Sequence, residues 1–348
     1  PSVSIHLLGA NEETLQNWQG ALEKLTKEIF EKLDLEAKKR DSGGYAFVAE
    51  KGGADYIHCA QCGYLDKQAV AKRAKSMLST EEPRELEKVE TPDAHTIEAL
   101  AAFLNIPKEK TAKAVFMTAT IKDKEKLIFA ILRGDMALGE AKLIASLGAS
   151  ALRPATDDEI LAIGAVPGYA SPVGMKEVLV VVDDLIPESS NLVAGANEEG
   201  FHLRNVNYGR DYEASIVTDI ALAQAGDRCP KCNAALDAVE GVDLVEITPV
   251  LSMKEATFTD ENGKGQPILG VSWTLDLGRI FAAVAENHHD DYGLILPPAI
   301  APYDIHLVWL PSKNVNTKTD ADDLYLNLTN TGFTVLYDDR DARAGTKF

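Results

Sequence analysis

Four cysteines are the residues of this 348-residue chain whose spacing most directly indicates chemistry. They form two Cys-x-x-Cys pairs, Cys59 with Cys62 and Cys229 with Cys232, and 166 residues lie between the pairs. Two such pairs are typical of four thiolate ligands around one Zn²⁺. A metal shared by pairs so far apart would hold together the two ends of an intervening domain. The spacing therefore predicts a structural zinc site, and free thiols without a metal are the alternative.

The composition is that of an ordinary globular protein, with 45% hydrophobic and 26% charged residues. This excludes a disordered chain, a collagen and a disulfide-stabilised miniprotein. No apolar run approaches the roughly 18–20 residues of a membrane helix, so we expect no membrane partner. With 54 acidic and 35 basic residues the net charge is −19, which excludes a broadly basic nucleic-acid-coating protein but not local basic patches.

The start of the chain and its few cysteines favour a reducing, cytoplasmic location. Residues 1–6 lack the charged and apolar regions of a secretory signal, and four cysteines do not suggest a disulfide framework. The first residue is Pro1 rather than Met, so we expect a start that has been processed or cut.

The first elements are a helix and two short strands. A 3-4-3-4 apolar spacing predicts a helix, with one buried face made of Leu15, Trp18, Leu22, Leu25 and Ile29. Runs at 45–50 and 55–59 flank a Gly-Gly pair and predict a β-hairpin that leads into the first cysteine pair. Residues 67–92 are polar and are interpreted as a linker, with a solvated helix face that carries Lys67, Lys72, Arg73 and Lys75. Contact of these cations with nucleic-acid phosphates is the alternative.

Alternating elements then predict a compact mixed α/β domain. The predicted helices are 96–104, 138–147 and 157–163, and the predicted strands are 113–119, 126–132 and 177–182. Thr156 and Glu159 form a capping-box signature before the third helix. Because the cysteine pairs flank this domain, the pattern indicates one domain inserted into another.

The last third of the chain contains two further patterns. Residues 256–269 predict a hairpin about 261–264, and a helix is expected to begin at Gly278 and Arg279. A strand at 305–310, a helix at 321–328 and a strand at 334–337 then predict a strand–helix–strand unit.

A set of ordered motifs resembles bacterial-type prolyl-tRNA synthetase, a class II aminoacyl-tRNA synthetase. The motifs are Leu-Arg-Gly-Asp at 132–135 and those at 164–172, 192–197, 207–211, 227–232, 256–260, 288–293, 300–303 and 335–340. The resemblance implies a class II antiparallel-sheet core that is split by an inserted mixed α/β editing domain and followed by a partial α/β anticodon-binding domain. The expected boundaries are 1–75 and 223–300 for the core, 76–92 for a linker, 93–222 for the editing domain and 301–348 for the anticodon-binding part.

The family's editing domain hydrolyses alanine wrongly attached to the proline tRNA, because a synthetic site cannot reject a smaller amino acid by size. The resemblance places the editing lysine at Lys113, whose cation would hold a phosphate or ribose of the tRNA; a surface lysine is the alternative. It also matches a Gly-x-x-x-Pro loop whose backbone N–H groups would stabilise an oxyanion. This loop consists of Gly168, Tyr169, Ala170, Ser171 and Pro172. An ordinary tight turn is the alternative for the loop.

Four further editing-site residues follow from the same resemblance. His202 falls where the family has a pocket histidine, with a structural histidine as the alternative. Asp183 falls at a pocket-lining aspartate, although its neighbour Asp184 competes for that place. Arg133 and Asp135 would lie beside the pocket, or would form a buried ion pair that shapes their turn.

Several family features are absent or altered. The first two class II motifs, which serve dimer contacts and amino-acid activation, have no counterpart, and the anticodon domain is represented by about its first third. In the third motif only Gly278 and Arg279 match, so Arg279 is the residual ATP contact. Trp273, Leu275 and Asp276 replace a Gly-rich run and would fill or repel at a nucleotide site. We therefore expect a truncated chain that has lost amino-acid activation.

These features leave three functional hypotheses. The first is a deacylase that removes alanine from the proline tRNA. The second is proline–tRNA ligase seen as a fragment, which would use ATP and Mg²⁺. The third is a non-catalytic scaffold, motivated by the apolar residues Trp273, Leu275 and Trp309, which would lie exposed and bind a protein. The expected partners are tRNA, and a protein or a second copy of the chain.

Overall fold

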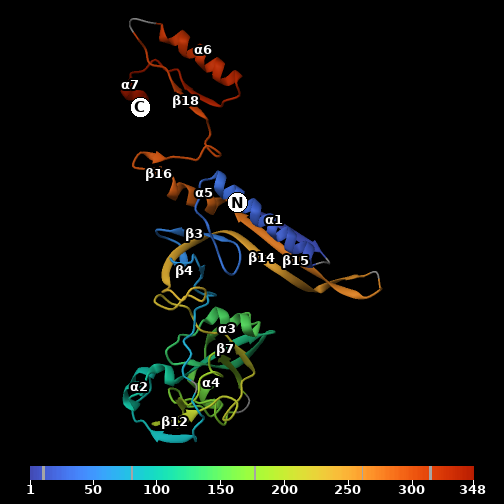
Figure 1. The fold of residues 1–348 in the computed structure, drawn as a ribbon, viewed down its shortest axis with the longest axis vertical. Coiled ribbons are helices and arrows are strands. Elements are labelled where there is room, and N and C mark those ends of the chain that lie inside the picture. Colours follow the sequence, from blue (N-terminus) through green and yellow to red (C-terminus); the bar gives the residue numbers. More distant parts are fainter. Residues whose placement is uncertain (10–11, 80, 176–177, 261, 313–315) are drawn as a thin grey trace. The chain divides into compact units, whose positions relative to one another are not determined.

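The computed structural model describes residues 1–9, 12–79, 81–175, 178–260, 262–312 and 316–348, apart from the side chains of 249–256. These residues form two compact units (Figure 1). The host unit consists of Pro1–Lys39, Gly43–Ala49 and Val242–Phe348, and the inserted unit consists of Arg40–Ser42 and Glu50–Gly241. The inserted unit therefore interrupts the sequence of the host unit. It also contains both cysteine pairs, which we expected in the synthetase-like core, so the finer domain boundaries stay a prediction.

The host unit is built on an antiparallel sheet. The strand order is β1 (Ser2–Gly9), β15 (Gly265–Asp276), β14 (Asp237–Thr259), β3 (Tyr45–Ala49) and β2 (Lys38–Lys39). Helices α1 (Glu12–Lys32) and α5 (Leu277–Asn287) contribute to its core, where Leu22 and Phe30 join Trp273 and Leu275 of β15. The expected antiparallel core is therefore present.

The buried face of α1 differs from the predicted one. Leu15 and Leu22 are buried as expected, but Trp18 is 39% exposed and Leu25 is 42% exposed. Thr26 takes the buried position because its hydroxyl donates to the carbonyl of Leu22 and accepts from the Trp273 indole N–H at 2.9 Å. Apolar spacing alone could not identify a polar residue that is satisfied inside the core.

The predicted hairpin at 45–59 is wrong in its pairing, although both strands exist. Strand β3 pairs with β2 and β14, whereas β4 (Ala54–His58) pairs with the start of β14 and with β5 (Leu65–Lys67). The partner of both strands lies almost 200 residues away in sequence, so local turn signals were misleading. The hairpin at 256–269 is confirmed by the pairing of Thr259 with Gly265, and Glu261 of its turn lies outside the described residues.

The C-terminal pattern is confirmed as a parallel strand–helix–strand unit. It consists of β18 (Ile305–Val308), α6 (Thr317–Asn330) and β19 (Val335–Asp338), and α7 (Ala344–Lys347) follows. A small ribbon of β16 (His289–Asp290) and β17 (Gly293–Leu294) follows α5. Within the described part of the chain, every helix is too short or too polar to cross a membrane.

The inserted unit is a mixed α/β structure with two sheets. The larger sheet has the order β13 (Ile216–Thr218), β10 (Leu179–Asp183), β8 (Lys124–Arg133), β7 (Ala112–Ile121) and β9 (Ala151–Pro154). Its middle strands carry apolar side chains on both faces, as in Phe129 and Ile131 on one side and Ile128 and Ala130 on the other. A sheet that is covered on both faces explains the continuous apolar runs.

Shorter elements complete the inserted unit. The smaller sheet has the order β11 (Leu192–Gly195), β12 (Phe201–Val206) and β6 (Glu87–Glu90), so β6 lies within the predicted linker. The helices are α2 (Ile97–Leu104), the 3-10 turn η1 (Lys108–Lys110), α3 (Glu140–Leu147) and α4 (Asp157–Ala162). The capping box of Thr156 and Glu159 at the start of α4 is confirmed.

Candidate active site of the inserted unit

A cavity of about 500 Å³ lies in the inserted unit. Lys113, Gly168, Ala170 and His202, all expected at the editing site, belong to its wall. They come from β7, from the loop before β10 and from β12, and the start of α2 contributes the adjoining wall from Ala94 to Glu98. The fold therefore brings residues that are far apart in sequence to one hollow of ligand size.

Lys113 supplies a cation to this cavity. It is half-buried near the start of β7, where it pairs in register with Leu132 of β8. Its nearest wall acid, Glu98, instead forms an ion pair with Lys108 at 2.6 Å. Among the described residues no carboxylate pairs with the Lys113 ammonium, which is thus free to meet an anionic ligand.

The loop at 168–172 is held against β11 by a close backbone contact. The Tyr169 carbonyl accepts the N–H of Asn197 at 2.8 Å. A Cβ at Gly195 would lie 2.1 Å from the same carbonyl oxygen, so only glycine fits there. Gly168 has a φ of +82°, a left-handed conformation that also favours glycine. Both glycines therefore fix the shape of the loop.

Only part of the loop can offer N–H groups to a ligand. The N–H of Ser171 donates to Asn197 Oδ1 at 2.8 Å, and the N–H of Tyr169 donates to the Val166 carbonyl. For the N–H groups of Gly168 and Ala170 no acceptor exists among the residues described. Tyr169, Ser171 and Pro172, which we expected at the site, do not belong to the cavity wall and support the loop from behind.

His202 is a buried, neutral wall residue. Its Nδ1 lies 2.6 Å from the Thr91 hydroxyl, and burial lowers its pKa to about 4. The ring of Tyr169 lies between two imidazoles, with its centroid 5.4 Å from that of His202 and 5.4 Å from that of His95. His95, an exposed wall residue at the start of α2, was missed in the sequence; its position just before the Thr96 helix cap was the available signal.

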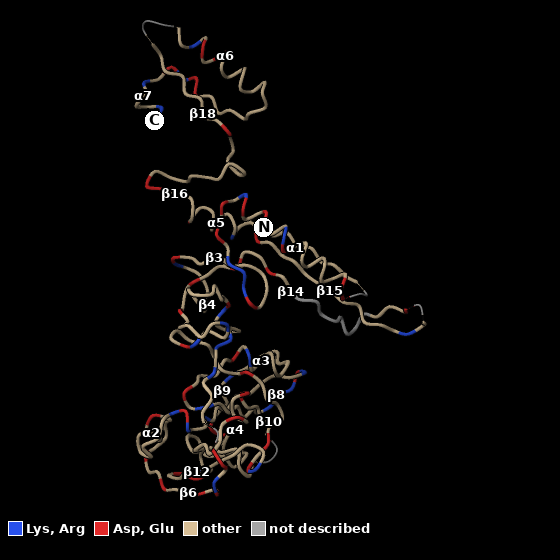
Figure 2. Tube along the Cα trace, in the orientation of Figure 1, with Lys and Arg blue, Asp and Glu red and all other residues tan. Residues whose placement is uncertain are grey.

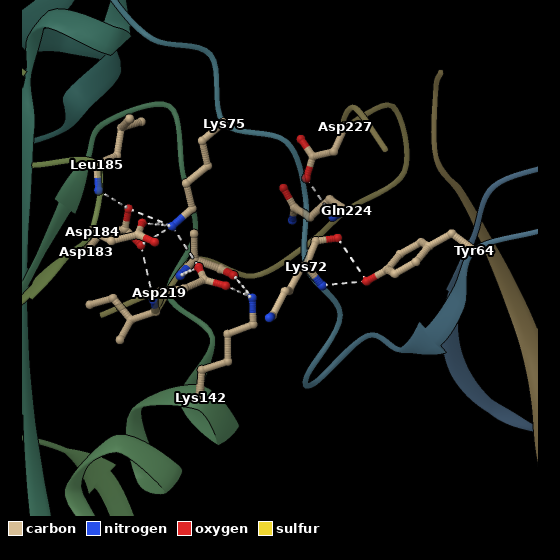
Figure 3. A network of polar contacts seen from close by, with 12 residues as sticks. Tyr64, Lys72, Lys75, Lys142, Asp183, Asp184, Leu185, Asp219, Gln224 and Asp227 are labelled. Atoms are coloured by element: carbon tan, nitrogen blue, oxygen red, sulfur yellow. Dashed lines mark hydrogen bonds and ion pairs between the residues drawn. The ribbon is translucent and has the colours of Figure 1, made fainter. Parts of the chain in front are cut away.

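Asp183 is not among the residues that line the cavity, and its expected role in substrate binding stays a prediction. Its carboxylate is fully buried and contacts the Lys75 ammonium at 2.7 Å (Figure 3). The same ammonium contacts Asp184 at 2.5 Å and Asp219 at 2.7 Å. Burial alone would lower the pKa of Lys75, but the three carboxylates outweigh it and raise that pKa. Asp183 therefore anchors the chain around Lys75.

Arg133 and Asp135 form the buried ion pair that was the alternative to a role at the pocket. The guanidinium is 1% exposed and donates to both carboxylate oxygens, at 2.6 and 2.7 Å. It also donates to the carbonyl of Ser76, while Gly134 between them belongs to the cavity wall. The pair shapes the turn and leaves the backbone of Gly134 facing the cavity.

The expected solvated helix face at 67–75 is wrong. This stretch is irregular after β5, and its backbone is fixed by the Tyr64 hydroxyl, which bonds the N–H and carbonyl of Lys72 (Figure 3). Arg73 forms an ion pair with Asp227 at 2.6 Å, and Ala74 bridges Arg228. We call residues 72–75 the strap, because they join the second cysteine segment to the sheet of the inserted unit.

The four cysteines converge although the pairs are far apart in sequence. All four Sγ atoms of Cys59, Cys62, Cys229 and Cys232 lie within 4.8 Å of one another. Cys59 Sγ lies 3.5 Å from Cys232 Sγ, and Cys62 Sγ lies 3.5 Å from Cys229 Sγ. This donor set fits a structural metal ion.

The altered third motif belongs to the core of the host unit. Trp273 is 3% exposed and Leu275 is 4% exposed, so they neither fill a nucleotide site nor form an exposed patch. Asp276 caps α5 by accepting the N–H of Arg279. The Arg279 guanidinium is exposed and lies 3.5 Å from the Asp276 carboxylate. Trp309 is half-buried and donates to the Thr317 hydroxyl, so the scaffold hypothesis loses its apolar patch.

Charges are intermixed along the inserted unit. In Figure 2 basic residues alternate with acidic ones along its trace, and many are paired, as in Lys88 with Glu198 and Lys110 with Glu81. Lys113 forms no such pair among the described residues and, unlike the exposed lysines of β8, belongs to the cavity wall.

Comparison with known proteins gives two kinds of match. Residues 91–212 match the aminoacyl-tRNA editing domain family. The chain is 39% identical to a proline--tRNA ligase of Dehalococcoides mccartyi over 97% of its own length and 60% of that protein. It is 41% identical to a proline--tRNA ligase of Salinispora tropica over 87% of its length and 53% of that protein. The chain thus spans between half and two thirds of the length of these relatives.

A solved structure also matches a smaller part of the chain. Prolyl-tRNA synthetase from Cryptosporidium parvum, complexed with halofuginone and AMPPNP, is 27% identical with a TM-score of 0.28. The match covers 31% of this chain and 23% of that one.

Proposed function

The chain belongs to the bacterial-type prolyl-tRNA synthetase family, and from this we propose that its inserted unit hydrolyses alanine mischarged onto the proline tRNA. The observation that carries the proposal is the shared cavity of Lys113, the 168–172 loop and His202. An editing site needs a cation for the tRNA end, donors for the developing oxyanion and a small chamber for the amino acid. The cavity offers all three.

Each group has a distinct part in ester hydrolysis. The Lys113 ammonium binds a phosphate or ribose oxygen of the terminal adenosine. A water molecule attacks the ester carbonyl, its proton passes by way of the neighbouring ribose hydroxyl to the leaving ribose oxygen, and the N–H groups of Gly168 and Ala170 stabilise the oxyanion. The ester C–O bond then breaks, and alanine and the tRNA leave. Neutral His202 holds Thr91 and orders the wall instead of transferring a proton.

Small wall residues support selectivity for alanine. Ala94, Ala112, Ala114 and Gly134 line the cavity beside the loop. One extra methylene in a pocket is worth about 1–3 kcal/mol, so a second site can reject proline more effectively than a synthetic site rejects alanine.

Deacylation of Ala-tRNA(Pro) by the purified chain tests this function. We expect hydrolysis above the buffer rate, and a loss of at least about tenfold in Lys113→Ala, because one charge-assisted hydrogen bond is removed. Lys126→Ala is the matched control, since Lys126 is an exposed lysine on the neighbouring strand β8. Hydrolysis at the buffer rate by the unmodified chain would refute the proposal.

Proline–tRNA ligase is the second candidate, favoured by the identity to ligases over nearly the whole chain. ATP and Mg²⁺ would be its cofactors, and Arg279 is the family's expected ATP contact. Its guanidinium lies beside Asp276, a carboxylate that competes with a phosphate for this cation. Proline-dependent ATP–pyrophosphate exchange decides between the candidates: we expect none from this chain.

A further inference from the structure

We propose that Cys59, Cys62, Cys229 and Cys232 bind one Zn²⁺ that closes the base of the inserted unit. The proposal is independent of the hydrolytic function, because it concerns how the unit is held together.

The two cysteine pairs form matching turns. The N–H of Gly63 donates to the Cys59 carbonyl at 2.9 Å, and the N–H of Asn233 donates to the Cys229 carbonyl at 3.0 Å. The residue after each second cysteine is left-handed, with a φ of +73° at Gly63 and +62° at Asn233. The N–H of each first cysteine also donates to the carbonyl of the residue five positions later, from Cys59 to Tyr64 and from Cys229 to Ala234. Two sequences 170 residues apart thus adopt the same ligand-presenting turn.

Strand pairing places the two turns beside each other. Cys59 follows β4 directly, and the second pair precedes β14. His58 at the end of β4 is in register with Asp237 at the start of β14. Antiparallel pairing therefore puts both cysteine turns at the same end of the two-stranded segment formed by β4 and the start of β14.

The sulfur positions match a tetrahedral site. Four thiolates at a Zn–S distance of about 2.3 Å are separated by about 3.8 Å from each other. The observed separations run from 3.5 Å to no more than 4.8 Å. A pair of disulfides would instead bring two sulfur pairs to about 2.05 Å and leave the others farther apart.

The surroundings suit a metal thiolate centre. Cys59 and Cys229 belong to a small apolar core and Cys232 packs against it, while Cys62 is exposed. The members of this core are Ile57, Cys59, Tyr64, Ala71, Ala223, Cys229 and Leu236, with Cys232 and Ala234 at its edge. Zinc with four thiolates has a net charge of −2, and Lys231 lies between two of the ligands in sequence. A core this small gains its stability from a bound metal.

The metal would link the two chain segments between which most of the inserted unit lies. The chain between Cys62 and Cys229 contains the cavity, both sheets and the strap. Arg73 and Ala74 of the strap contact Asp227 and Arg228 beside the second pair. Loss of the metal would therefore loosen the strap as well as the turns.

Metal analysis of the purified full-length chain tests the proposal. We expect about one zinc ion per chain, four thiols that react with a thiol reagent only after chelation and unfolding, and a lower Tm after chelation that added ZnCl₂ restores. Co²⁺ exchange should give the visible absorption of a tetrahedral thiolate site. Reduced protein that takes up no added zinc, two disulfides found by mass spectrometry, or bound iron would each overturn the assignment.

Two substitutions at the exposed ligand Cys62 separate metal binding from folding. Cys62→Ser should lose the zinc, whereas Cys62→His should keep it, because three cysteines and one histidine also form a zinc site. Equal zinc content in both variants and the parent would place the metal elsewhere and refute the site. If Cys62→Ser does not fold, zinc bound to folded Cys62→His still supports the assignment, and zinc-free folded Cys62→His contradicts it.

Discussion

Burial sets the chemistry of individual residues at the candidate site. His202 is 4% exposed, and its hydrogen bond to Thr91 fixes the ring without supplying a negative charge. Protonation would therefore place an uncompensated charge in the protein, which is why its pKa falls to about 4. Lys113, by contrast, is half-buried in the cavity wall, and no ion pair with a described carboxylate holds its ammonium. His202 thus positions the cavity wall, and the Lys113 ammonium is available to bind an anionic ligand.

The His202 shift predicts a loss of stability in acid. The folded pKa of about 4 lies below the unfolded value of about 6.5, so the unfolded chain binds the proton first and stability falls as the pH drops through this window. Between pH 7.5 and pH 4.5 we expect this group to remove about 2.5 kcal/mol. Urea unfolding across this range, compared with His202→Gln, measures it. Parallel pH curves for both proteins would contradict the assigned pKa.

Gly195→Ala should damage the loop beside the cavity. The added methyl group would meet the Tyr169 carbonyl oxygen, so the loop must move, at a cost of about 1–3 kcal/mol in stability. Because small displacements of reacting groups are costly, we also expect about a 100-fold loss of deacylation. Gly20→Ala in α1 is the control: its Cβ has open space, and stability should rise by about 0.5–1 kcal/mol. Unchanged deacylation in Gly195→Ala would show that the loop position is unimportant.

At the scale of elements, the strap shows how an irregular segment can be as firmly held as a strand. Lys75 contacts Asp183, at the end of β10, and Asp219, just after β13. These parallel strands end side by side, so their carboxylates gather at one edge of the sheet. The Lys75 cation offsets part of this negative charge, and Lys142 of α3 adds a second cation at Asp219. The sheet edge and the strap therefore depend on each other.

Lys75→Met should destabilise the inserted unit by about 3–5 kcal/mol, because it leaves the buried Asp183 carboxylate unpaired. Lys72→Met, an exposed lysine of the same strap, should change stability by no more than about 0.5 kcal/mol. The double variant Lys75→Met with Asp183→Asn should recover part of the loss. Urea unfolding of the three proteins measures these differences, and equal midpoints for both single variants would show that the strap is not anchored by Lys75.

The sequence predicted the positions of helices and strands better than it predicted which strands pair and which side chains contact each other. Helical period and capping signals located α2 and α4, and short apolar runs located β7 and β8, because all these patterns depend on residues within four positions of each other. The strands β6, β11 and β12 were missed because they are short and pair only with each other. Asp183 was assigned to the pocket because its partner Lys75 lies 108 residues away, a distance over which no local pattern reports a contact.

At the scale of the whole molecule, the two units contain different parts of the motif set that resembles the prolyl-tRNA synthetases. The inserted unit keeps a cavity with Lys113, Gly168 and His202 in its wall, which the family resemblance predicted. The host unit has Trp273 and Leu275 in its core, so packing accounts for the apolar residues of the altered third motif. The convergence of the four cysteines agrees with their spacing, which indicated a shared site before the intervening fold was known.

The central claim is that the cavity is a hydrolytic site that selects for small amino acids. The most direct test is the single-turnover rate of hydrolysis of Ala-tRNA(Pro) and of Pro-tRNA(Pro) by the same purified chain. The account predicts that the alanyl ester is hydrolysed at least about tenfold faster than the prolyl ester, and that Lys113→Ala slows alanyl-ester hydrolysis at least about tenfold by weakening the binding of the tRNA end, which the two esters share. Equal rates for the two esters, or hydrolysis of neither, would contradict it.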